Sequence, residues 1–224
     1  MTFEPYFLLI TLHVVLFAYW LGGDYGVFVC SRYIARPELS LAERERFLEA
    51  LMAIDILPRT AIVLLPFVGL QLASFRGSVD ISQTGLIIAW TIAAIWLFVV
   101  WSAYRNMRKP SGIIWQRVDV SWRVILILIL TASGISSLNK AWPVNADWIA
   151  VKLLVYAALL CVGLYLRISI RGWTEGFKRL RAGESGPDID ALFVDGRRRA
   201  KYAAFLFWSL IVAMAWLGIR QSIN

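Results

Sequence analysis

The sequence predicts an all-α protein, a polytopic transmembrane bundle of six helices that forms one integral membrane domain over residues 1–224. Hydrophobic residues make up 59% of the chain and the mean hydropathy is +0.66, which is too apolar for a soluble domain. Six apolar runs approach the ~20 residues that cross a ~30 Å hydrocarbon core. Seventeen of the 23 lysines and arginines lie in alternate connections, around 30–53, 105–121 and 167–201.

The expected helices can be justified in chain order from these runs. Ser40 and Glu43 have the spacing of a capping box, which predicts a helix that begins outside the membrane and continues into the second run. The fourth run is short and needs its polar flanks to complete the crossing. After the fifth, Trp173, Phe177 and Leu180 recur at helical spacing among basic residues, as in a helix on an anionic leaflet. The spans are expected at about 6–29, 54–74, 85–104, 122–138, 148–168 and 202–219.

The distribution of cations predicts the topology. Cytoplasmic loops of membrane proteins are enriched in lysine and arginine, so the three basic connections should be cytoplasmic and both termini periplasmic. This interpretation places the chain in a bacterial-type inner membrane. It also accounts for the net charge of +8 without nucleic acid, which is not an expected partner. The expected partners are the lipid bilayer and, in addition, a second copy of the chain or a larger membrane complex.

The middle of the chain has the pattern of an internal repeat. Asp55 and Arg59 stand four residues apart at the entry of the second run, and Asp119 and Arg123 repeat this spacing 64 residues later. The expected repeat units, 54–105 and 118–168, are two helical hairpins that enter the membrane from the same side. Such a duplication implies a repeat axis along the membrane normal.

Polar residues inside the apolar runs fall into two layers, and the inner layer contains most of the charge. At ~1.5 Å per residue, its five members lie in the cytoplasmic third of the membrane. They could neutralise one another and brace the first, second and fourth spans, or they could line a path for an ion or proton. Both interpretations stay open for Asp24, Asp55, Arg59, Asp119 and Arg123.

The outer layer consists of His13 and Lys152, and here the chain resembles a known family. The stretch LHVVLFAYWLGG is similar to the first helix of CopD-like and HemJ-like membrane proteins, with its leucine–histidine pair, tryptophan and glycines. MAIDILPRTAIVLLPFVGLQLA resembles their second helix, and DWIAVKLLVYAALLCVGLYLR resembles their tryptophan-x-x-x-lysine helix. The resemblance covers about a quarter of the chain.

The resemblance implies a redox function. In HemJ-type protoporphyrinogen oxidases the first-helix histidine ligates haem and the lysine is needed for activity. Those roles transfer to His13 as a ligand of haem iron and to Lys152 as a catalytic residue. The chain departs from that family in having a further hairpin, where the oxidases have four helices, and in the charged Asp24 beside its glycines. A single histidine and four methionines make copper handling a poor match.

Three functions are therefore open from the sequence. The first is an inner-membrane redox protein associated with haem or another lipophilic cofactor, and thus a possible oxidoreductase. The second is a transporter or channel that uses the intramembrane Asp/Arg network. The third is a non-catalytic, tryptophan-rich helical subunit of a membrane complex.

Overall fold

The structure is a computed structural model that describes residues 4–107, 109–139, 144 and 146–223. Three residues of interest lie outside the described part of the chain. They are Arg108, a cation of the second basic connection, and Lys140 and Trp142, which lie between the fourth and fifth expected spans. All regular structure in the described part is helical, and six helices are long and apolar enough to cross a membrane. The predicted fold class is confirmed. The helices are α1 (Pro5–Ile34), α2 (Leu41–Phe75), α3 (Gln83–Arg105), α4 (Ser111–Leu138), α5 (Asp147–Ser169), α6 (Gly172–Arg181) and α7 (Pro187–Ile223).

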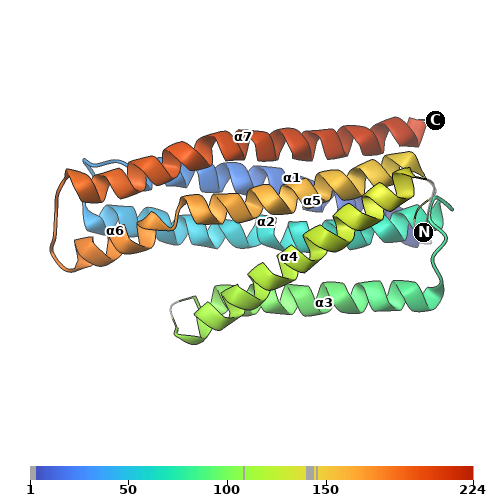
Figure 1. The fold of residues 1–224 in the computed structure, drawn as a ribbon, viewed down its shortest axis with the longest axis horizontal. Coiled ribbons are helices and arrows are strands. Elements are labelled where there is room, and N and C mark those ends of the chain that lie inside the picture. Colours follow the sequence, from blue (N-terminus) through green and yellow to red (C-terminus); the bar gives the residue numbers. More distant parts are fainter. Residues whose placement is uncertain (1–3, 108, 140–143, 145, 224) are drawn as a thin grey trace.

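Several helices extend well beyond the predicted membrane spans. As the Ser40–Glu43 capping box predicts, α2 begins at Leu41, ahead of the apolar run expected from 54, and both reciprocal contacts of the box are present. α7 likewise begins at Pro187, 15 residues before its apolar run. The backbone continues because caps and prolines, rather than hydropathy, decide where a helix begins. Figure 1 shows these extensions gathered at one end of the bundle and both chain termini at the other.

α2 is the most buried of the membrane-length helices and occupies the centre of the bundle (Figure 1). Its neighbour α1 approaches closely because α1 has glycines at the contact. A methyl group at Gly23 would lie 2.8 Å from Pro58 Cδ, and one at Gly26 would lie 3.2 Å from Ile54. The segment that carries Asp24 is thereby held directly against the segment that carries Asp55.

Pro66 interrupts the hydrogen-bond ladder of α2, and α5 repairs the interruption. Proline has no N–H, so the carbonyl four residues earlier, that of Ile62, loses its helical donor. The hydroxyl of Tyr156 in α5 donates a 2.6 Å hydrogen bond to this carbonyl, and Tyr156 itself is 5% exposed. The hydrogen bond that α2 lacks because of Pro66 is thus replaced by one between α2 and α5.

A second hydrophobic cluster closes the end of the bundle where the helices extend. α6 packs its aromatic face into this cluster, so protein and not lipid covers Trp173 and Phe177, which corrects the expectation for this face. Trp173 and Phe177 are buried there because Phe193 of α7 fills the space above Gly176. Arg44 adds an ion pair of 2.7 Å to Asp190. We refer to this cluster as the end cap; its buried apolar residues are Ile34, Leu51, Trp173, Phe177, Ile189 and Phe193.

Replacing Tyr156 by Phe should destabilise the fold because the Ile62 carbonyl would be left buried without a donor. The expected loss in the free energy of unfolding is about 1–3 kcal/mol, measured by SDS titration in mixed micelles and followed by circular dichroism. In the Pro66→Ala background the same change should cost much less, since an alanine at this position restores the helical N–H.

The matched control is Tyr19→Phe, which removes an exposed hydroxyl and should leave stability unchanged. Equal losses from Tyr156→Phe with proline or alanine at position 66 would contradict this account of the contact.

Candidate functional site

A polar cavity lies between the end cap and the main hydrophobic cluster of the bundle. We call this main cluster the membrane core; it includes Trp20, Val63, Trp96, Leu159 and Phe207. The volume of the cavity is about 210 Å³, and its walls come from α1, α2, α5 and α7, with one side chain each from α4 and α6. Trp20 and Phe207 close it on the core side, while Leu51 and Trp173 close it on the side of the end cap. Five charged side chains line the cavity: Asp24, Asp55, Arg59, Arg123 and Arg167.

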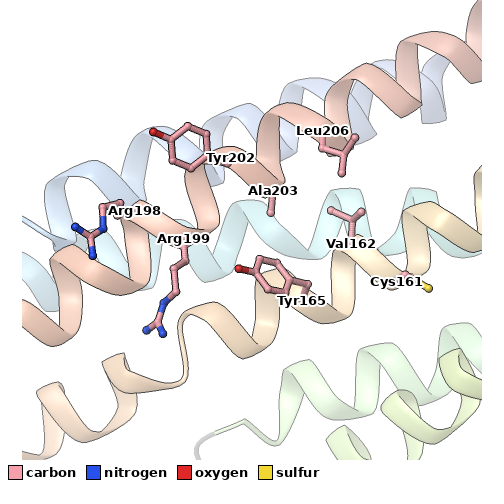
Figure 2. A pocket seen from close by; sticks show the side chains of 8 residues that line it. All are labelled: Cys161, Val162, Tyr165, Arg198, Arg199, Tyr202, Ala203 and Leu206. Atoms are coloured by element: carbon pink, nitrogen blue, oxygen red, sulfur yellow. The ribbon is translucent and has the colours of Figure 1, made fainter.

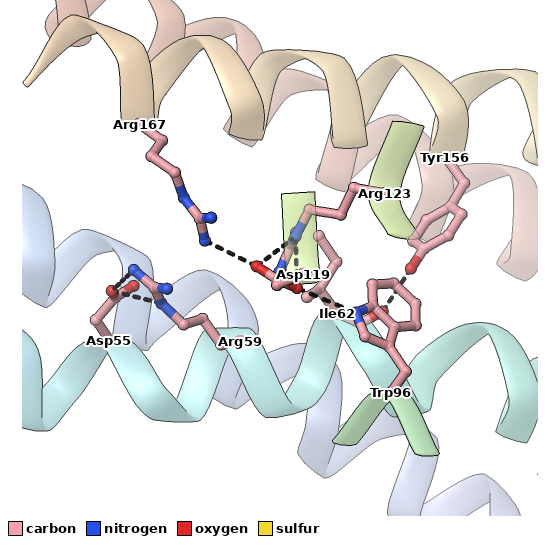
Figure 3. Close-up of polar contacts among 8 residues, drawn as sticks. All are labelled: Asp55, Arg59, Ile62, Trp96, Asp119, Arg123, Tyr156 and Arg167. Carbon is pink, nitrogen blue, oxygen red and sulfur yellow. Dashed lines mark hydrogen bonds and ion pairs between the residues drawn. The ribbon is translucent and has the colours of Figure 1, made fainter. Parts of the chain in front are cut away.

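Asp119 organises the charges beside this cavity. Its carboxylate is 2% exposed and accepts hydrogen bonds from three different helices (Figure 3). Arg123 Nε of α4 donates at 3.1 Å and Arg167 Nη2 of α5 at 2.9 Å. The indole of Trp96 in α3 donates at 3.3 Å, and the Arg123 guanidinium stacks over its ring at 5.6 Å. Both oxygens of the buried Asp119 carboxylate thus accept hydrogen bonds from charged donors. Such donors offset the cost of burying a charge in low-dielectric surroundings.

The second predicted pair, Asp55 and Arg59, is more open. Arg59 Nε donates to Asp55 Oδ2 at 2.6 Å within α2, and the side chains are 33% and 17% exposed for Arg59 and Asp55. Figure 3 shows this pair on α2, facing α5, from which the Arg167 side chain extends toward Asp119. Arg59 also lies near enough to interact electrostatically with Asp119 and Arg167. The two predicted pairs therefore belong to one site.

Asp24 differs from the other acidic residues of the site. Its carboxylate accepts a 2.7 Å hydrogen bond from the Trp208 indole of α7. Among the described residues, no lysine or arginine forms an ion pair with it. Asp24 nevertheless faces the same cavity as Asp55, and the two carboxylates interact electrostatically. Of the two carboxylates that line the cavity, Asp24 is the one whose side-chain hydrogen bond comes from a neutral donor, the Trp208 indole.

The structure separates the outer residues His13 and Lys152 from this cavity. His13 packs toward α2, where a methyl group at Gly69 would lie 3.5 Å from its Cε1, and its Nδ1 is buried without a hydrogen-bond partner in the described part of the chain. Lys152 Nζ lies 5.2 Å from the centre of the Trp148 ring and against Gly218 of α7. The two residues contact different helices but interact electrostatically. Neither residue lines the cavity.

The predicted bracing of helices takes a different form from the one expected. Both Asp/Arg pairs lie within single helices, and the contacts between helices are made by side chains that the sequence did not single out. The distribution of cations in the sequence assigned Arg167 to a basic cytoplasmic loop. Its position in the last turn of α5 is a signal that its side chain can reach back into the bundle, as it does to Asp119. Trp96 and Trp208 carry no such signal, because their acceptors belong to distant segments.

Comparisons with known proteins leave the family open. No family model, curated protein or solved structure matches the chain. The similarity to CopD-like and HemJ-like proteins therefore stays a prediction. No group of three or more histidine, cysteine, aspartate or glutamate side chains that could hold a metal ion occurs in the part of the chain that the structure describes.

The two carboxylates should differ sharply when each is changed to its amide. Asp119→Asn strands the buried Arg123 charge, removes the carboxylate that Arg167 binds, and should cost about 3–5 kcal/mol of unfolding free energy in micelles. Asp55→Asn should cost clearly less because Arg59 is one-third exposed and faces the cavity. Equal costs for the two variants would contradict the assignment of Asp119 as the structural centre.

Proposed function

We propose that the chain is an ion-translocating membrane protein that carries protons through the bundle, with Asp24 as the residue that takes up and releases them. One observation carries the proposal: a cavity lined by five charged side chains contains a carboxylate with no cationic partner among the described residues. Ionisable residues within membrane spans often mark proton relays or ion paths.

The chemistry of Asp24 supports a change of charge state at this position. Asp55 and Asp119 form ion pairs with arginines, which balance the charge of each carboxylate. At Asp24 no cation of the described chain balances the charge, so binding a proton is the available way to remove it from low-dielectric surroundings. Asp55 and Arg59 also line the cavity, and their ion pair lies within α2. Either side chain can therefore bind an ion in the cavity without any movement of the helix.

His13 supplies a second titratable group on the same helix. His13, Trp20 and Asp24 fall on one face of α1, at intervals of seven and four residues. The separation of His13 from Asp24 is about 16 Å at 1.5 Å per residue, so water must complete any relay between them. The buried Nδ1 of His13 has no hydrogen-bond partner in the described part of the chain, so it can bind a water molecule of such a relay.

The orientation that we propose follows from the cations. With the end cap and the basic connections in the cytoplasm, both termini are periplasmic, and the two termini do lie at one end of the bundle (Figure 1). The cavity would then lie toward the cytoplasmic side, and His13 toward the periplasmic side of an inner membrane of bacterial type.

A second candidate is a haem-associated redox function, which the resemblance implies and His13 favours. A buried imidazole nitrogen without a partner is chemically suited to ligate haem iron. Lys152 would then act near the group, as a partner for a carboxylate. This function ranks second because neither the cavity nor the surface groove described below includes either residue.

Proton translocation can be tested in sealed vesicles that contain a trapped pH-sensitive dye. Under a potassium diffusion potential set by valinomycin, the protein should acidify the vesicle interior faster than protein-free vesicles. Asp24→Asn should reduce the rate to that of protein-free vesicles, because the amide cannot bind a proton.

The control variant is Asp80→Asn, which changes an exposed carboxylate in the connection between α2 and α3 and should leave the rate unchanged. Wild-type protein that is folded but does not acidify the vesicles, or full activity of Asp24→Asn, would overturn the proposal.

The redox candidate predicts a Soret absorption band in protein purified in mild detergent. His13→Ala should abolish the band because the iron ligand is lost, whereas Lys152→Gln should retain it. Colourless wild-type protein after growth with a haem precursor would exclude this candidate. If that protein also carries no protons, the remaining function is that of a helical subunit, which co-purification with a partner complex would reveal.

A further inference from the structure

A groove runs along the outer surface between α5 and α7, on the far side of these helices from the polar cavity. Its volume is about 620 Å³. Figure 2 shows its side chains: Arg198 and Arg199 lie at one end, and Val162 and Leu206 lie farther along the two helices. No step of the proposed proton path uses these residues.

The groove changes character along its length. At the basic end, Arg198 and Arg199 are exposed, and Tyr202 is 70% exposed one turn farther on. Beyond Tyr202 the lining is apolar. The change coincides with the start of the apolar run of α7, which follows directly after the sequence GRRRAK. The groove therefore crosses the boundary between the aqueous phase and the hydrocarbon core.

The basic end has donors available for a ligand. Arg198 forms a 3.1 Å ion pair with Asp195, but both side chains are largely exposed, and such surface pairs contribute little stability. A guanidinium group has five N–H donors, so this pair leaves most of them free. In Figure 2 the phenol of Tyr165 lies beside Arg199, where its hydroxyl adds a neutral donor at the same level.

We propose that this groove binds an anionic phospholipid. The phosphate group would lie between Arg198 and Arg199, with the tyrosine hydroxyls at its edge, and one acyl chain would follow Val162 and Leu206 into the membrane. Charge complementarity favours an anion at one end, and the apolar remainder requires an attached hydrocarbon chain. A soluble anion would leave that part of the groove exposed to lipid without using it.

The proposal can be tested by native mass spectrometry of the full chain in detergent, with dioleoyl phosphatidylglycerol as the probe and dioleoyl phosphatidylcholine as the neutral reference. Wild-type protein should bind the anionic lipid more tightly. Arg198→Gln/Arg199→Gln should weaken that binding by about tenfold or more, as expected for loss of charge-assisted hydrogen bonds. Excess inorganic phosphate should not displace the lipid, because it cannot fill the apolar part.

The matched control is Arg46→Gln/Lys178→Gln, which removes the same charge from exposed positions of α2 and α6 outside the groove and should leave lipid affinity unchanged. Leu206→Trp keeps both arginines but fills the apolar part, and should also weaken binding. Unfolding free energies of all variants should match that of the wild type, since the changed side chains are exposed. Equal affinity for the two lipids, displacement by phosphate, or unchanged binding by the double arginine variant would overturn the proposal.

Discussion

The need to neutralise one buried carboxylate shapes the centre of the molecule. Asp119 is enclosed by the bundle, where an unpaired charge would cost several kcal/mol, and its donors come from α3, α4 and α5. These donors must converge on two oxygen atoms, so they restrict how three helices can be placed around one point. Dispersion and close packing act without direction. The hydrogen bonds to Asp119 supply the direction that apolar contacts in a membrane lack.

The sequence predicted those parts of the fold that depend on local pattern. Hydropathy placed all six spans, and the Ser40–Glu43 spacing predicted the start of α2 correctly. Contacts between distant segments could not be predicted in this way. Nothing near Trp96 or Trp208 indicates that their indoles face carboxylates 23 and 184 positions away. The aromatic face of α6 was wrongly assigned to a membrane surface, because an amphipathic pattern does not say whether lipid or protein covers it.

The position of the cavity follows from the two hydrophobic clusters. The membrane core packs around α2, and the end cap packs around Phe193, so each cluster buries its own apolar side chains. Where they meet, the helices carry charged residues in place of aliphatic ones, and the packing leaves a space. Arginine and aspartate side chains that face one another across such a space can be hydrated. The chain thus places its polar groups where the two clusters meet.

The hydrogen bond between Tyr156 and the Ile62 carbonyl restricts the movements that transport would require. Only one register of α5 brings the phenol to the missing position in the ladder of α2. A slide by one turn would break this bond and leave the carbonyl without a donor in an apolar interior, which disfavours such a slide by about 1–3 kcal/mol. This bond therefore favours one register of α5 against α2. Side-chain and water rearrangements around the cavity would give alternating exposure to the two sides without breaking this bond.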